Sequence, residues 1–154
     1  MSSVDHASRR PSLWKDTLNG FIAWIIAFAV YMIPAFAVAI PMGFDLGPKL
    51  HNNAEVSRRI SQAISGMYGS SLYLRIGYIA VLGILVFWRS WVNAGRSAEK
   101  TILHGATIGC AAAIMVLVQM ASSGAGLYMA IPAAVSIAAG VIGGMKRVPH
   151  SAAL

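Results

Sequence analysis

One arginine of this 154-residue chain lies where an apolar medium would make its charge costly. Arg75 precedes 13 uncharged residues, IGYIAVLGILVFW, which end before Arg89. A cation at membrane depth is a functional candidate, because it needs a partner there. The nearest opposite charges are Asp45 and Glu55. A pair of Arg75 with Asp45 would join two membrane helices at their outer ends. The alternative is an arginine whose side chain extends to the phosphates of the lipid headgroups.

Two rows of small residues indicate close packing of helices. Small residues recur at intervals of four in two rows. One row is Gly105, Gly109 and Ala113, and the other is Ser136, Gly140 and Gly144. Small residues at this spacing let helix backbones approach closely in lipid, where dispersion and weak hydrogen bonds replace the hydrophobic drive. We expect the two rows to pack against each other. Packing of either row against another protein is the alternative.

Residues 53–67 have the pattern of an amphipathic helix. Apolar residues recur there with the spacing of one helix face, at Val56, Ile60, Ala63, Ile64 and Met67. We expect an interfacial helix over 53–66, with Asn52 or Asn53 as its N-cap and with Arg58 and Arg59 as its basic residues. Such a helix could act as an elbow that orients the next span, or as a docking surface for a partner or solute.

Known catalytic and metal-binding patterns are absent from the sequence. It has no Gly-rich phosphate loop, no HExxH motif and no cysteine pair. The histidines at 6, 51, 104 and 150 do not recur at ligand spacing, and we expect each at a surface or boundary. Cys110 is expected to be a small apolar core residue. The sequence therefore predicts no metal and no cofactor, and it favours a protein that is not an enzyme.

The composition indicates a membrane protein. Hydrophobic residues make up 57% of the chain and charged residues 11%, with a mean hydropathy of +0.66. Soluble domains average about 25% charged residues, and a small soluble domain cannot bury nearly all of its surface. The 12 basic residues against 5 acidic ones stand at the ends of apolar runs, so they form no stripe for nucleic acid. Hydrocarbon is the medium that fits these numbers.

The uncharged stretches predict four spans. Residues 17–44 carry no charge and predict a span over 20–41, with a kink at Pro34 and an end at Pro41. The 45 uncharged residues 101–145 predict two spans, 102–121 and 126–145, joined by the turn-forming ASSGAG. The 13 residues before Arg89 are too short to cross about 30 Å of hydrocarbon. The second span is therefore expected over 67–88, beginning ahead of Arg75.

The distribution of basic residues predicts the orientation. Eight Lys and Arg residues fall on the side of the two termini and four on the other side. Because cytoplasmic segments collect Lys and Arg, the tails 1–16 and 146–154 are expected in the cytoplasm. Aromatic residues agree, with Trp14, Trp88 and Trp91 at the expected inner boundary and Tyr68, Tyr73 and Tyr128 at the outer one.

These patterns together predict a single membrane domain over 1–154. Its fold class is all-α, an integral membrane four-helix bundle with a short amphipathic interfacial helix between spans one and two. Its expected partners are the lipid bilayer and either other membrane proteins or copies of itself, with no nucleic acid. We expect a non-enzymatic accessory or assembly subunit that acts through transmembrane helix contacts. The alternative is a small-solute transporter or channel that works as an oligomer, with Arg75 near its outer mouth.

Overall fold

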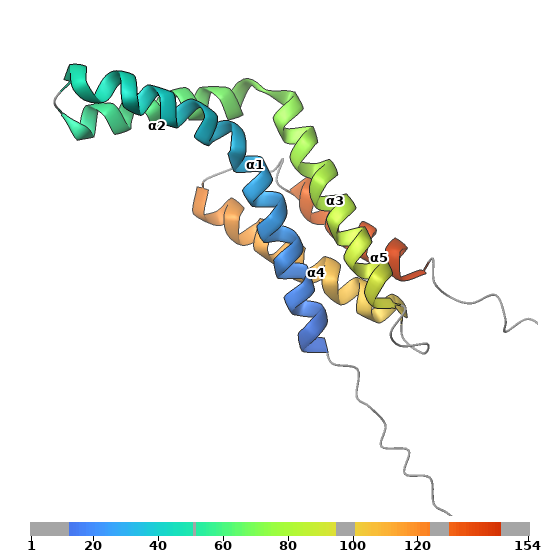
Figure 1. Ribbon diagram of the computed structural model, residues 1–154. Coiled ribbons are helices and arrows are strands. Elements are labelled where there is room, and N and C mark those ends of the chain that lie inside the picture. The colour runs from blue at the N-terminus through green and yellow to red at the C-terminus, as the bar shows by residue number, and fades with distance from the viewer. Residues whose placement is uncertain (1–12, 51, 95–100, 124–129, 146–154) are drawn as a thin grey trace, which may run out of the picture.

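The computed structural model describes residues 13–50, 52–94, 101–123 and 130–145, and their regular structure is entirely helical. The helices are α1 (Leu13–Leu50), α2 (Asn53–Ser70), α3 (Leu72–Ala94), α4 (Thr101–Ser123) and α5 (Ala130–Met145). The first part of α1 packs with α3, α4 and α5 into a bundle, while the last part of α1 and α2 form an arm beside it (Figure 1).

Three of the described helices are long and apolar enough to cross a membrane, namely α1, α3 and α4. The fourth apolar helix, α5, has 16 residues. The span expected at 126–145 begins four residues earlier, and those four lie outside the described residues, as do most of the two expected tails. The chain therefore has the helices of a multi-pass membrane protein.

Helix α1 is longer than its sequence predicts. It continues through Pro34, Pro41 and Pro48 to Leu50, so the expected end at Pro41 is wrong. Each proline removes one backbone hydrogen bond, but the three are seven residues apart and the bonds between them are kept. Figure 1 shows that α1 bends as it leaves the bundle and then runs beside α2.

The junction between α2 and α3 also differs from expectation. The second span was predicted to begin at residue 67, but α2 continues to Ser70 and α3 begins at Leu72. Ser71 has extended backbone angles of φ −88° and ψ 101°, and its N–H donates to the carbonyl of Met67 at 3.1 Å. Its Oγ accepts from the N–H of Leu74 at 3.3 Å. Ser71 thus ends one helix and begins the next.

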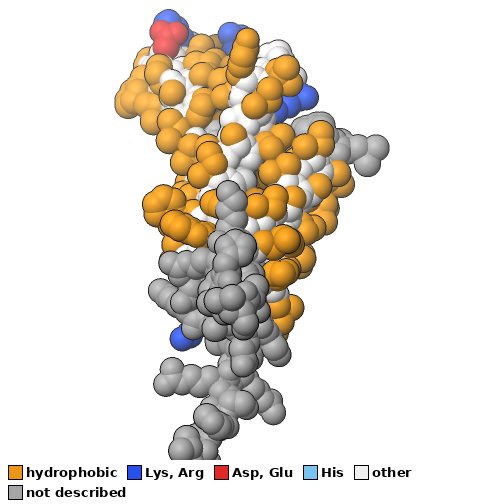
Figure 2. Space-filling view, turned by 90° about the vertical axis from the view of Figure 1, so that its right-hand side faces the viewer, with side chains coloured by type: hydrophobic (Ala, Val, Ile, Leu, Met, Phe, Trp, Pro, Cys, Tyr) orange, Lys and Arg blue, Asp and Glu red, His pale blue; other side chains and the backbone are white. Residues whose placement is uncertain are grey.

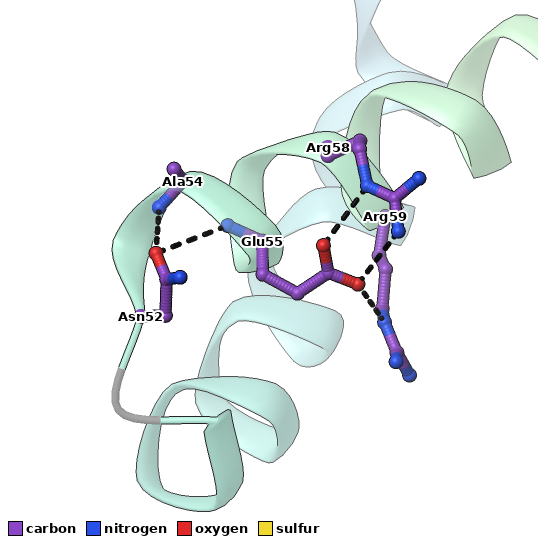
Figure 3. A network of polar contacts seen from close by, with 5 residues as sticks. All are labelled: Asn52, Ala54, Glu55, Arg58 and Arg59. Carbon is purple, nitrogen blue, oxygen red and sulfur yellow. Dashed lines mark hydrogen bonds and ion pairs between the residues drawn. The ribbon is translucent and has the colours of Figure 1, made fainter.

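The side chains of α2 follow the predicted periodicity. The five apolar residues of the predicted stripe are half-buried, whereas most other side chains of this helix are exposed. The stripe faces α1, because a Cβ on Gly43 would lie 4.0 Å from Cδ1 of Ile60. Asn52 is the N-cap, and its Oδ1 accepts from the N–H groups of Ala54 and Glu55 at 3.0 and 3.4 Å (Figure 3).

Small side chains bring the helices of the bundle together. A Cβ on Gly105 or Gly140 would collide with the carbonyl of the other residue, and one on Gly109 would lie 2.6 Å from the carbonyl of Ser136. Helices α4 and α5 are therefore in backbone contact. Two further close approaches lie outside the predicted rows. Gly20 of α1 sits against α4, and a Cβ added to Gly143 of α5 would lie 2.7 Å from the carbonyl oxygen of Phe87.

Large apolar side chains cover the outside of the bundle. Ile33, Ile84 and Ile114 are each more than half exposed, and so are several others on α1, α3 and α5. Cys110 is exposed on α4, so its expected place in the core is wrong. Figure 2 shows a broad apolar belt between charged atoms at the upper end and Lys or Arg atoms near the lower end. Lipid is the medium that such a surface fits.

Candidate functional site: a buried polar end of the bundle

A carboxylate and an imidazole meet inside one end of the bundle. Asp16, in the first turn of α1, contacts Nδ1 of His104, in the first turn of α4, through Oδ2. The two side chains are only 7% and 8% exposed. The other ring nitrogen of His104, Nε2, is buried and has no hydrogen-bond partner among the described residues. An ionisable pair that is buried between two apolar helices marks a candidate functional site.

The sequence did not predict that either member of this pair is buried. Asp16 was expected in the cytoplasmic tail and His104 at a surface or boundary, whereas both are buried. Asp16 enters the bundle because α1 begins at Leu13, ahead of the expected span. Gly20, one turn further along, allows α1 to approach α4 so closely that a Cβ there would lie 2.7 Å from Cβ of Ala111. A small residue one turn after an acid was the available signal, although it is common in any sequence.

Further polar groups share this end of the bundle. Ser90 near the end of α3 and Thr101 at the start of α4 are both buried. Both face the end of α5, since a Cβ on Gly143 would meet Cβ of Ser90 at 2.8 Å and one on Gly144 would meet the carbonyl of Thr101 at 2.5 Å. The hydroxyl of Ser90 has no partner among the described residues. The ends of four helices thus enclose a polar region.

A second polar contact joins α1 and α3 at the same end. Nη1 of Arg89 donates to Oδ1 of Asn19 at 3.1 Å. The amide nitrogen of Asn19 donates to the carbonyl of Lys15 at 2.8 Å, which fixes the orientation of the amide group. The guanidinium is therefore held in place by a neutral side chain.

Gln119 is the centre of a polar cluster deeper in the bundle. Its Oε1 accepts from Nε1 of Trp24 and from the hydroxyl of Tyr78, each at 3.3 Å. Tyr31 packs against Tyr78 with ring centroids 4.9 Å apart. Tyr68 of α2 donates its hydroxyl to the carbonyl of Tyr31 at 2.5 Å and so ties the arm to the bundle. These contacts give the indole N–H and the tyrosine hydroxyl groups hydrogen-bond acceptors, which lipid chains do not offer.

The acidic residues considered as partners of Arg75 are bonded within their own helices. Asp45 contacts Lys49, four residues later. Glu55 accepts from Arg58 and Arg59 at 2.9 Å each (Figure 3). These hydrogen bonds, chiefly that of Arg58, lower the pKa of Glu55 from 4.5 to about 2. The spacings i+3 and i+4 on one helix are the sequence signal for such pairs.

Arg75 lies in the first turn of α3 and points back toward α2. It donates to the carbonyl of Gly69 at 2.6 Å and to that of Tyr68 at 3.4 Å. These carbonyls belong to the last turn of α2, where a helix leaves acceptors without intrahelical partners and where cations are favourable. Arg75 therefore holds the junction between the arm and the bundle.

Within the described residues, no three His, Cys, Asp or Glu side chains come close enough to hold a metal ion. Comparisons of the chain with protein-family models, with curated proteins and with solved structures found no match.

Proposed function

We propose that the chain is a non-enzymatic accessory or assembly subunit of a membrane complex, which acts through transmembrane helix contacts. The observation that carries the proposal is the arm. Helix α1 has 38 residues, about 57 Å at the helical rise, whereas a span of the hydrocarbon needs about 30 Å. The part of α1 beyond the length of one span packs beside α2, and α2 contributes no buried residue to the fold. The arm is thus a fixed element that the bundle does not need for its core.

The arm presents apolar side chains on the part of α1 that leaves the bundle. Phe36, Ile40 and Phe44 are 59%, 56% and 80% exposed. An ordered arm with an apolar face is suited to contact with the helices of a neighbouring protein. Its order comes from the Asn52 cap and from the hydroxyl bond of Tyr68, which both restrict its motion.

The packing of α4 and α5 favours an assembly role over a pore between these helices. Gly105 and Gly140 bring the two backbones into contact, so no solute can pass between them. An oligomer could still enclose a path between the outer faces of neighbouring copies.

The proposal includes an orientation with both termini in the cytoplasm and α5 as a fourth span. The support is the predicted excess of basic residues on that side. Single cysteines placed at Ser3 and at Asn53, in a Cys110→Ala background, should react in opposite ways with an impermeant thiol reagent on intact cells. We expect Asn53→Cys to react and Ser3→Cys to be protected. The reverse pattern would overturn the orientation.

Photo-crosslinking tests the assembly role. A photoreactive amino acid at Ile40 or Phe44 should give one adduct of constant mass with another membrane protein. The same substitution at Ile84, which is 63% exposed on the bundle, is the matched control and should give lipid adducts only. That protein should also co-purify in a fixed ratio in mild detergent. A single monodisperse homo-oligomer, with no adduct from the arm to another protein, would refute the proposal.

The second candidate function is transport of a small solute by an oligomer, and the buried contact of Asp16 with His104 favours it. Carboxylates and imidazoles enclosed between membrane helices serve as proton relays in transporters. Reconstituted vesicles should then lose flux in the Asp16→Asn variant, and in Arg75→Gln if that arginine lies at the outer mouth. Unchanged flux in either variant would remove that residue from the mechanism.

A further inference from the structure

A groove runs between α1 and α3 at the polar end of the bundle. Its volume is about 470 Å³, which falls within the usual range of about 300 to 1,000 Å³ for ligand sites. Residues of both helices line it, among them Asn19, Ile26, Leu85, Trp88, Arg89 and Asn93. It lies on the outside of the bundle and is separate from the contact of Asp16 with His104.

The groove contains a cation without a counter-ion in the described chain. Arg89 is half-buried and forms no ion pair with any residue that the structure describes; its contact is with the neutral Asn19. A guanidinium has five N–H donors in a planar fork that matches a phosphate. Nδ2 of Asn93, one helical turn along α3, is buried and unpartnered among the same residues. Arg89 therefore has N–H donors beyond the one that Asn19 accepts, and the unpartnered amide nitrogen of Asn93 lies one turn along the same helix.

The carboxylate nearest in the sequence to the α1 side of the groove does not neutralise Arg89. Asp16 is bonded to His104 in the bundle interior. Among the described residues, a second basic side chain near this end is that of Lys15, which is exposed in the first turn of α1. The groove therefore has a positive charge that an anion would balance.

Polarity changes along the groove in one direction. Leu85, Arg89 and Asn93 are successive turns of one face of α3, about 12 Å in length. Asn19 faces Arg89 at the polar end, and Ile26 lies two turns further along α1, toward the apolar belt. A ligand that fits this order has an anionic group at one end and a hydrocarbon chain at the other.

We infer that the groove is a binding site for an anionic phospholipid, with its phosphate on Arg89 and Asn93 and an acyl chain along Ile26 and Leu85. The position of Trp88 supports a lipid over a soluble anion. Its indole is 61% exposed beside the groove, and tryptophan prefers the level of the lipid headgroups. The net charge of +7 on the chain adds an attraction for anionic lipids.

Lipid retention tests the site. The purified protein is incubated in detergent with equal amounts of phosphatidylglycerol and phosphatidylcholine, and native mass spectrometry counts the bound lipids. We expect retention of one phosphatidylglycerol in preference to phosphatidylcholine. Arg89→Gln should lower that retention about tenfold or more, because the charge-assisted hydrogen bonds from the guanidinium to the phosphate are lost. Arg89→Lys should restore most of it.

Two controls separate the site from a general effect of charge or folding. Arg58→Gln removes a cation from the arm and should leave retention unchanged. Ile26→Trp fills the apolar half of the groove without altering its charge, and it should also lower retention, which keeps the test valid if Arg89→Gln does not fold. Equal retention by wild type, Arg89→Gln and Ile26→Trp would overturn the inference. Displacement of the lipid by 10 mM inorganic phosphate would identify a soluble anion and would overturn it as well.

Discussion

Asp16 of α1 and His104 of α4 face each other across a helix interface, although 88 positions separate them in the chain. Each side chain is more than nine-tenths buried, so the contact replaces water that both groups would otherwise bind. It fixes the start of α1 against the start of α4 at the end of the bundle where the groove of Arg89 lies.

Loss of one member of this pair should destabilise the bundle. Asp16→Ala leaves the ring of His104 without its acceptor, and an unsatisfied buried group costs about 1 to 3 kcal/mol. Thermal unfolding in detergent should show a lower midpoint. Asp45→Ala, which removes the exposed contact with Lys49, should change stability by no more than about 0.5 kcal/mol. Equal shifts in the two variants would contradict the buried contact.

The double variant Asp16→Leu with His104→Leu provides a second test of the same contact. With both partners apolar, no buried polar group is left without a hydrogen bond. The thermal unfolding midpoint of the double variant should therefore lie above that of Asp16→Ala. If the double variant were less stable than Asp16→Ala, the pair would stabilise the fold by more than the hydrogen bond that each partner provides for the other.

Two glycines of the spans should respond in opposite ways to one added methyl group. Gly140→Ala places a Cβ against Gly105 and Gly109, and overpacking of this kind costs about 1 to 3 kcal/mol. Gly77 has no atom within 4 Å of an added Cβ, so Gly77→Ala should be neutral or stabilising. Thermal midpoints in the same detergent measure both. Our account of the contact between α4 and α5 would be wrong if Gly140→Ala were as stable as Gly77→Ala.

Gln119 should contribute more to stability than either donor that it accepts from. Gln119→Leu leaves Nε1 of Trp24 and the hydroxyl of Tyr78 without this acceptor, and we expect a loss of about 1 to 3 kcal/mol. Tyr78→Phe removes one donor and leaves the other bond intact, so its loss should be smaller. The order of the two unfolding midpoints is the readout, and a reversed order would contradict the central role of Gln119.

The arm should lose a stabilising interaction in acid. The bonds from Arg58 and Arg59 favour the ionised form of Glu55 and lower its pKa from 4.5 to about 2. A lowered pKa in the folded state stabilises that state above the unfolded value, and the effect disappears as the pH falls from 4.5 to about 2. Carbon-13 NMR of the Glu55 carboxyl should give a midpoint near the lower value. With Arg58→Gln and Arg59→Gln together the midpoint should rise toward 4.5; an unchanged midpoint would exclude the two arginines as the cause.

Local patterns predicted the helices better than their ends. The stripe of Val56, Ile60 and Met67 depends on helical periodicity alone, and it gave the face of α2 that packs on α1. The predicted end of α1 depended on the assumption that Pro41 stops the helix. Helix α1 continues through Pro34, Pro41 and Pro48. Whether a proline ends a helix or only removes one of its hydrogen bonds depends on the surrounding structure, which the local sequence does not report.

The candidate site could not be predicted in the same way. Arg75 attracted attention because it flanks an apolar run, whereas its observed acceptors are the carbonyls of Tyr68 and Gly69 at a helix end. Asp16 and His104 stand near the ends of their own uncharged stretches, where a charge normally meets water. Nothing in either local sequence indicates that the other residue lies opposite.

The sequence by itself determined the medium, since 57% hydrophobic and 11% charged residues favour hydrocarbon over water. It also determined where helices occur along the chain, although not where α1 and α2 end, because helical periodicity and uncharged length are properties of neighbouring residues. The tertiary structure alone decided that α1 reaches past the bundle and which polar groups meet inside it. Those contacts join residues far apart in the chain, and they depend on how closely small residues such as Gly20 and Gly143 let the helices approach.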